Sequence, residues 1–457
     1  MTMTPSAEHV LATTVADLPR QHWSDTAARL ASAAIADTLA IGVAGVREPQ
    51  TAQALATVSA GAGDLAAPLW LQADRYHVAD AAFVSGVACH SLDWDDYMHP
   101  MHGHCSAVLL ATTWPLVARA GGSCGDLLDA FLAGYQVNYL ASHLLGTAHY
   151  ERGWHATSTV GTLGAAAAAS RVLALDAEQT TAALAIAASF ASGLRVNFGS
   201  STKALHAGAA ARHGVQAALL AAAGATASPH WLTGRYGMWE TFGGEPDPLD
   251  ADGLVALSQG PHGIESAWGL VQKPYCCCGS CHAAIDAVIA LAVELDASPG
   301  VIDRIEVHVD PIVPGIMRVQ TPTDPSNARY CLPWAVATAA AHRAAGPAQF
   351  DVAALADQQV RQLQQRVQVI ADLPATDEDR FAARVVMHAR GTFRQHEVRY
   401  ASGHPRNPMS DQQRRAKQLA ALVPVLGEQT ARSVLTHADD MASSTPLATL
   451  TGLINHS

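Results

Sequence analysis

The segment KPYCCCGSCHAAIDA, residues 273–287, marks the point at which the character of the chain changes. Before it, from about residue 24 to 268, Ala, Leu and other small residues recur at helical spacing. After it, the stretch RIEVHVD alternates, with Ile305, Val307 and Val309 on one face, as in a half-buried strand. The sequence therefore predicts a helical part followed by a mixed α+β part.

The N-terminal part has the pattern of a helical bundle. SDTAARLASAAIADTLAIGVAG opens with Ser24, a favoured N-cap residue, and stops at Gly45. Segments of the same kind start near Ala79, Gly125 and Lys203. Their many Ala and Gly residues allow helices to approach closely, which favours a packed bundle.

The C-terminal part mixes both periodicities. AAIDAVIALAVEL, LPWAVATAAAHRAAG and AALADQQVRQLQQRVQVI (residues 353–370) predict helices, and ARVVMHARGTFRQHEVRYASG predicts two strands joined near Arg390-Gly391. After GHPRNPMS, the stretch DQQRRAKQLAALVPVL is again helical and is expected to rejoin the first bundle. The predicted fold class is mostly α: a large all-helical domain from residues 1–272 and 404–457, plus a smaller α+β lid domain of residues 273–403.

Bulk composition limits the function. With 457 residues, 49% of them hydrophobic, the chain exceeds what one core usually organises. The net charge of −12 argues against nucleic-acid and anionic-membrane partners, but a local basic cluster can still bind a small acid. The start MTMTPSAEHVLATTVADLP lacks the cationic and apolar regions of an export signal, so we expect a cytoplasmic protein with reduced cysteines.

The densest polar constellation is HSLDWDDYMHPMHGHCS. Carboxylates and imidazoles are common ligands of divalent metals, but carboxylates also orient histidines for proton transfer. The spacing matches no metal motif with a fixed mechanism. A metal site, a metal-free polar site and a structural turn therefore all remain open for its seven members, His90, Asp93, Asp95, Asp96, His99, His102 and His104.

Two further candidates stand at predicted helix starts. His155 precedes Thr157-Ser158, where the helix dipole favours a neutral imidazole and free amides suit an anion. Lys203 follows a run of hydroxyl residues ending in Thr202, and its charge opposes the dipole unless a carboxylate binds there. The alternatives are a surface histidine and an exposed lysine without a role.

The cysteine-rich segment itself does not predict a metal or redox site. Its C-x-x-C pair, Cys278 and Cys281, has no second ligand pair of similar spacing and no surrounding βαβ unit. We therefore expect the cysteines to pack as small apolar residues. His282, at a helix start on the domain boundary, is the candidate for function there.

Six motifs in order together resemble the MmgE/PrpD family, which includes 2-methylcitrate dehydratases, cis-aconitate decarboxylases and iminodisuccinate epimerases. They are LDWDD, GHCSAV, GWHATSTVGTLGAAAAA, NFGSSTKALHAGAAARHG, KPYCCCGSCHAAIDA and GHPRNPMS. The resemblance implies a helical domain with an α+β lid, no metal or organic cofactor, and a homodimer. It implies a catalytic set of Asp93, His104, His155, Lys203 and His282, with Tyr97, Thr202 and His102 expected to bind substrate.

The chain departs from the family pattern beside these residues. Cys105 and Ala156 stand where proline follows the site histidines, and Tyr97 stands where the decarboxylases have threonine. Tyr330 and Trp334 replace the more common Phe and Tyr. These differences leave the charged residues intact and bear on the identity of the substrate.

The main hypothesis is a cofactor-independent lyase that dehydrates or decarboxylates a small di- or tricarboxylate such as 2-methylcitrate or cis-aconitate. Lys203 would neutralise a carboxylate, the histidines would supply acid and base, and Asp93 would orient a histidine. One alternative is an epimerase of an iminodisuccinate-like dicarboxylate, and another is a non-catalytic binding protein. A third is a metal-dependent hydrolase that uses Asp93, Asp95, His99 and His102.

Overall fold

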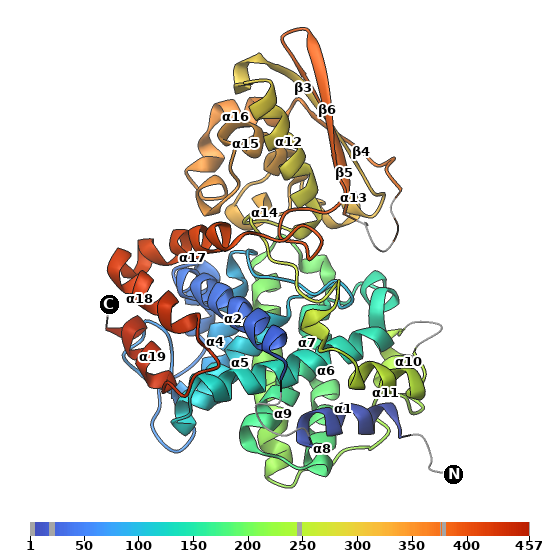
Figure 1. Ribbon diagram of the computed structural model, residues 1–457, viewed down its shortest axis with the longest axis vertical. Coiled ribbons are helices and arrows are strands. Elements are labelled where there is room, and N and C mark those ends of the chain that lie inside the picture. The colour runs from blue at the N-terminus through green and yellow to red at the C-terminus, as the bar shows by residue number, and fades with distance from the viewer. Residues whose placement is uncertain (1–4, 18–22, 245–248, 375, 377–380, 457) are drawn as a thin grey trace.

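The computed structural model describes residues 5–17, 23–244, 249–374, 376 and 381–456, and divides into two regions (Figure 1). The lower region in the view is helical, and the upper region places helices against a four-stranded sheet. The prediction of a mostly α protein with a smaller α+β part is confirmed. The helices of four or more residues are α1 (Ala7–Ala16), α2 (Asp25–Gly45), α3 (Pro49–Leu55), α4 (Val78–Ser91), α5 (Cys105–Ala120), α6 (Cys124–Glu151), α7 (Ala156–Leu173), α8 (Ala177–Phe190), α9 (Ser201–Ala222), α10 (Met238–Phe242), α11 (Ala251–Gln259), α12 (His282–Glu294), α13 (Val313–Ile316), α14 (Pro325–Ala328), α15 (Leu332–His342), α16 (Gln358–Gln364), α17 (Asp411–Leu426), α18 (Glu428–Ala438) and α19 (Leu447–Asn455).

The core of the helical region is built from small residues, as its sequence predicts. Helix α2 starts after Ser24, whose side chain accepts the Ala27 N–H as an N-cap. Helices α4, α5, α7 and α9 pack on one another along Ala- and Gly-rich faces. At Gly86 and Gly208, α4 and α9 touch backbone to backbone, so any larger side chain would force them apart. Helix α2 is long and apolar enough to cross a membrane by composition, yet most of it is buried in this core.

The sheet of the upper region has the strand order β4-β3-β5-β6. Its strands are β3 (Ile302–Val309), β4 (Val367–Ile370), β5 (Ala383–Ala389) and β6 (Thr392–Val398), and a small separate sheet pairs β1 (Ala66–Pro68) with β2 (Arg75–His77). Strand β3 runs parallel to β4 and antiparallel to β5, and its buried residues include Ile305, Val307 and Val309 as predicted. Helices α12 and α15 contact the strands.

The predicted hairpin is confirmed. Strands β5 and β6 are joined by Arg390 and Gly391, and both have positive φ, of 52° and 73°. Left-handed backbone at both central residues is what a two-residue type I′ turn requires.

One predicted helix is wrong in its second half. The stretch 353–370 forms α16 only over Gln358–Gln364, and residues 367–370 form strand β4 instead. The alternating Val367 and Val369 pair with β3, and this contact with a distant strand overrides the local helical pattern.

The C-terminal helices return to the helical region, as predicted. Helix α17 packs against α2, nearly the whole chain length away (Figure 1). The two segments that connect the regions lie side by side, as shown by the hydrogen bond from the Gln272 N–H to the Gly403 carbonyl.

Candidate active site

Three helix N-termini meet below the boundary between the two regions. We call residues 92–104, between α4 and α5, the acid loop. His104 is the N-cap residue of α5, His155 is that of α7, and Lys203 lies in the first turn of α9. The sequence-based placement of His155 and Lys203 at helix starts is confirmed. Since helix N-termini carry partial positive charge, their meeting point favours an anion.

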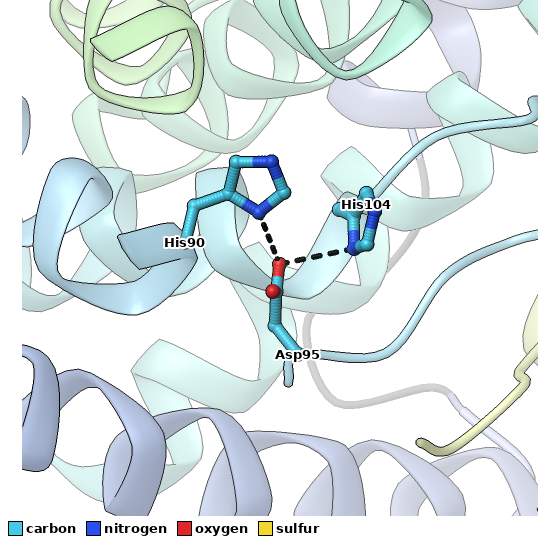
Figure 2. Close-up of side chains that lie close together, drawn as sticks. All are labelled: His90, Asp95 and His104. Atoms are coloured by element: carbon cyan, nitrogen blue, oxygen red, sulfur yellow. Dashed lines mark hydrogen bonds and ion pairs between the residues drawn. The ribbon is translucent and has the colours of Figure 1, made fainter. Parts of the chain in front are cut away.

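Asp95 lies between two imidazoles (Figure 2). Its Oδ2 is 2.8 Å from His90 Nδ1 and 3.1 Å from His104 Nδ1. Burial raises the pKa of Asp95, but the two histidines outweigh burial and hold that pKa well below its usual value. Asp95 is thus the carboxylate nearest His104, and the orienting role expected of Asp93 stays a prediction from the sequence.

Asp93 instead pairs with two lysines. Its Oδ1 is 2.6 Å from Lys273 Nζ and 3.1 Å from Lys203 Nζ, and His104 Nε2 is farther away at 3.9 Å. Burial raises the pKa of Asp93, and Lys203 and Lys273 more than reverse this, so the carboxylate stays ionised. Its φ of 48° is left-handed, a conformation that Asp tolerates better than most residues.

The buried histidines around these carboxylates are neutral near pH 7. Burial lowers the pKa of His90 to about 4, although Asp95 opposes the shift. Burial, with nearby His206 and Lys203, also holds the pKa of His155 well below its usual value. His155 Nδ1 is 3.0 Å from His206 Nδ1, so one of these rings donates to the other. Neutral imidazoles can accept or relay a proton when an acid binds.

Asp96, next in the chain, is a buried acid of a different kind. Burial, together with the neighbouring Asp37 and Asp95 carboxylates, raises its pKa to about 8. Asp96 is therefore mostly protonated at neutral pH. Asp37 in turn pairs with Lys417, at 2.6 Å.

A small cavity of about 50 Å³ opens onto this array. His104 connects the two, because it lines the cavity while its ring reaches Asp95 behind it. The other lining residues are Tyr97, His102, Gly103, Tyr150, Cys278, Gly279, Ser280, Ile316 and Phe381. A larger cavity of about 750 Å³ lies by α3, α14 and the start of α9, and the described residues that line it include no histidine or lysine.

The residues expected to bind substrate fall into two groups. Tyr97 and His102 line the cavity, with Tyr97 against Gly279 and His102 Nε2 3.0 Å from Thr147 Oγ1. Thr202 is half-buried in the first turn of α9 beside Lys203.

His282 contacts its own loop. Its Nε2–H donates to the Cys277 carbonyl at 3.2 Å, its ring meets Tyr275 edge-on, and, like His155 and Lys203, it is not among the described residues that line the cavity. Burial and Lys273 lower its pKa to about 3. A catalytic role for His282 stays a prediction from the sequence. In the structure it contacts the loop of residues 276–281, which we call the cysteine loop.

The predicted hydrolase ligands do not assemble as one set. The His99 ring lies tilted against Trp268 and His102, whereas Asp95 faces His90 and His104. The group with three ligand atoms within 4.8 Å of one another, in the described part of the chain, is His90, Asp95 and His104. A divalent cation there would compete with the close contacts between Asp95 and both rings.

The cysteines of residues 276–281 pack, as expected. Cys276 donates to the Leu92 carbonyl, and Cys277 Sγ lies 3.4 Å from Cys281 Sγ. Burial raises the pKa of Cys276 to about 12, so it remains a thiol. Only Cys278 is partly exposed, at the cavity edge.

Two residues of the array, Lys273 and His206, have no role in the prediction from the sequence, which includes His90 in the polar constellation and Tyr330 as a departure from the family pattern. The centre of the Tyr330 ring lies 5.4 Å from Lys203 Nζ, and burial, together with the nearby Asp93 carboxylate, raises the pKa of its phenol. The sequence does hold a signal for Lys273, because it is one of three lysines in the chain and lies within the motif KPYCCCGSCHAAIDA.

The fold and site define a mostly helical two-region protein with an Asp/His/Lys acid–base array at its helix N-termini. Sequence models of the MmgE/PrpD N-terminal domain and the MmgE/PrpD C-terminal domain match residues 9–249 and 275–441. The chain belongs to the MmgE/PrpD family, which confirms the resemblance drawn from its motifs.

Curated relatives of the chain include cis-aconitate decarboxylases. The protein of that name from Homo sapiens is 37% identical over 229 residues, which cover 49% of this chain and 47% of the relative. That from Mus musculus is 36% identical over 210 residues, 44% of this chain and 43% of the relative. That from Aspergillus terreus is 26% identical over 222 residues, 46% and 44% of the two chains. The matches thus span less than half the length of these relatives.

Proposed function

We propose that the protein is a lyase that decarboxylates or dehydrates a small polycarboxylate related to cis-aconitate, with no cofactor. The observation that carries the proposal is the position of His104, which faces the cavity while Asp95 holds its ring from behind. The family and the decarboxylase relatives support the reaction class.

Binding of the acid would rest on the helix N-termini and Lys203. An incoming carboxylate competes with Asp93 for the Lys203 ammonium, which lies 3.1 Å from that carboxylate now. Lys273, at 2.6 Å, keeps Asp93 paired. Fixed positive groups in a site shielded from water stabilise charge that spreads into a carboxylate during the reaction.

The chemistry needs one proton-transfer group at a carbon. In decarboxylation the bond to the departing CO₂ breaks, its electron pair moves through the adjacent double bond, and the far carbon takes a proton. In dehydration a proton leaves the carbon beside a carboxylate, and the hydroxyl departs as water after gaining a proton. We assign the transfer at carbon to His104 in both cases, because it lines the cavity and its Nδ1 contacts Asp95.

The test is proton NMR in D₂O with chelator-treated protein and cis-aconitate, 2-methylcitrate, citrate and iminodisuccinate in separate samples. A new alkene signal, or loss of CO₂ with one deuterium gained at carbon, supports the proposal and identifies the acid. Deuterium exchange with the skeleton intact would replace the lyase with the epimerase. Turnover that appears only when a divalent metal is restored would replace it with metal-dependent chemistry at His90, Asp95 and His104.

A further inference from the structure

The chain uses lysine in only three places. Of its 28 Lys and Arg residues, 25 are arginine, and the lysines are Lys203, Lys273 and Lys417. All three are buried, with exposed fractions of 5%, 0% and 6%. Lysine is ordinarily a surface residue, so the burial of all three lysines calls for partners that stabilise each ammonium group.

All three ammonium groups converge on the same part of the molecule. Lys203 and Lys273 pair with Asp93, and Lys273 also donates to the Asp93 main-chain carbonyl. Lys417 donates to the next carbonyl of the chain, that of Trp94, at 3.0 Å. Two consecutive carbonyls of the acid loop therefore accept hydrogen bonds from buried lysines of two distant segments of the chain.

Lys417 does not line the cavity, but it fixes the loop from behind. It extends from α17, donates to Asp37 Oδ2 of α2 at 2.6 Å, and lies 5.3 Å from the centre of the Trp94 ring. The Trp94 indole N–H donates to the Pro274 carbonyl on the other side, at 3.1 Å. Trp94 stands between Asp93 and Asp95, so its position sets the separation of the two carboxylates.

An arginine would not make the same contacts. An ammonium is a compact charge with three donors, which can reach a carboxylate oxygen and a carbonyl in different directions. A guanidinium is planar and directs its donors within one plane. The compact ammonium of Lys417 therefore suits its two acceptors, Asp37 Oδ2 and the Trp94 carbonyl.

We propose that Lys417 is a positioning residue for the reaction at the cavity, which it serves by holding the Trp94 carbonyl and so the acid loop. The inference rests on the proposed function. It adds helix α17, which follows the α+β region in the chain, to the elements that position the site.

The experiment compares Lys417→Met, the double variant Asp37→Asn/Lys417→Met, and the control Arg415→Met. The double variant removes both charges of the buried pair, so its thermal stability should recover toward that of the wild type. Its kcat should nevertheless stay about 100-fold down, the scale of the loss when reacting groups move by about 1 Å. Arg415 is on the same helix and pairs with Asp439 at the surface, so its replacement should leave kcat unchanged.

A second readout uses the small number of lysines. Lysine-selective ¹³C labelling gives one NMR side-chain signal per lysine. In the double variant, the signals of Lys203 and Lys273 should be shifted from their positions in the wild type. If kcat and both signals of the double variant match the wild type, Lys417 serves only as the counter-ion of Asp37, and the inference is overturned. Full activity of Lys417→Met would also overturn it, whereas a wild type inactive on every acid would refute the proposed function instead.

Discussion

Two segments of the chain are rich in metal-ligand residue types, and they behave differently in the structure. In residues 90–106, the side chains of Asp93, Asp95 and His104 form one connected ionic array next to a cavity. In residues 273–287, the buried thiols contact one another and nearby carbonyls. The density of such residues is similar in both segments, but only the first assembles a site.

The difference follows from what each segment packs against. The acid loop lies at the N-termini of three helices, where charge of either sign finds partners. The cysteine loop is buried among apolar side chains, where burial favours neutral thiols. Lys273 belongs to the second segment in sequence but to the first in space.

The largest effect that would sharpen this comparison is expected at His104. We expect His104→Gln to lower kcat by about 10²–10⁴, the usual contribution of a positioned general acid or base. The measurement is kcat and KM on the acid identified by NMR. His282→Gln is the matched control from the other segment, and a larger loss there than at His104 would reverse the assignment of the two histidines.

The next effect concerns the lysine that connects the segments. Lys273→Met leaves Asp93 without its shorter ion pair, and removing one partner of a buried pair costs about 3–5 kcal/mol of stability. Urea unfolding of the variant and the wild type measures the difference in their free energies of unfolding. Adding Asp93→Asn should restore part of the loss, because position 93 then carries no ionised carboxylate, and a double variant less stable than the single one would contradict the pairing.

A smaller effect distinguishes Asp96 from its ionised neighbours. Its folded pKa of about 8 lies above the unfolded value of about 3.9, so the stability due to its proton is lost as pH rises through 8. The melting temperature of Asp96→Asn minus that of the wild type should therefore increase from pH 6 to about pH 8 and level off above it. Asp303→Asn, exposed on β3, is the control, and a difference independent of pH would show that Asp96 is ionised throughout.

The smallest effect is expected in the cysteine loop. Cys277→Ala should cost about 1 kcal/mol, as for the loss of one small buried group, and leave kcat unchanged. Thermal unfolding and turnover of the variant test this together. Loss of turnover in a stable Cys277→Ala protein would give the loop a chemical role, and the two segments would then both contribute to the reaction.

Local structure could be predicted from the sequence wherever one element's own periodicity decided it. The N-cap at Ser24, the helix starts at His155 and Lys203, and the hairpin at Arg390-Gly391 all follow from neighbouring residues. The strand at residues 367–370 could not be predicted in this way, because its secondary structure depends on pairing with β3. The contact of Asp93 with Lys273 could not be predicted for a similar reason, since Lys273 lies 180 residues away.

By itself, then, the sequence determined a helical protein with an α+β part, the family to which it belongs, and the stretches that carry its charged residues. The tertiary structure decided which of those residues meet: Asp95 between two imidazoles, Lys273 and Lys203 on Asp93, and His282 on a carbonyl. The physical reason is that helix and strand patterns repeat over a few residues, whereas an ion pair depends on how distant elements pack. Only packing could bring Lys417 to Trp94, 323 residues away in the chain.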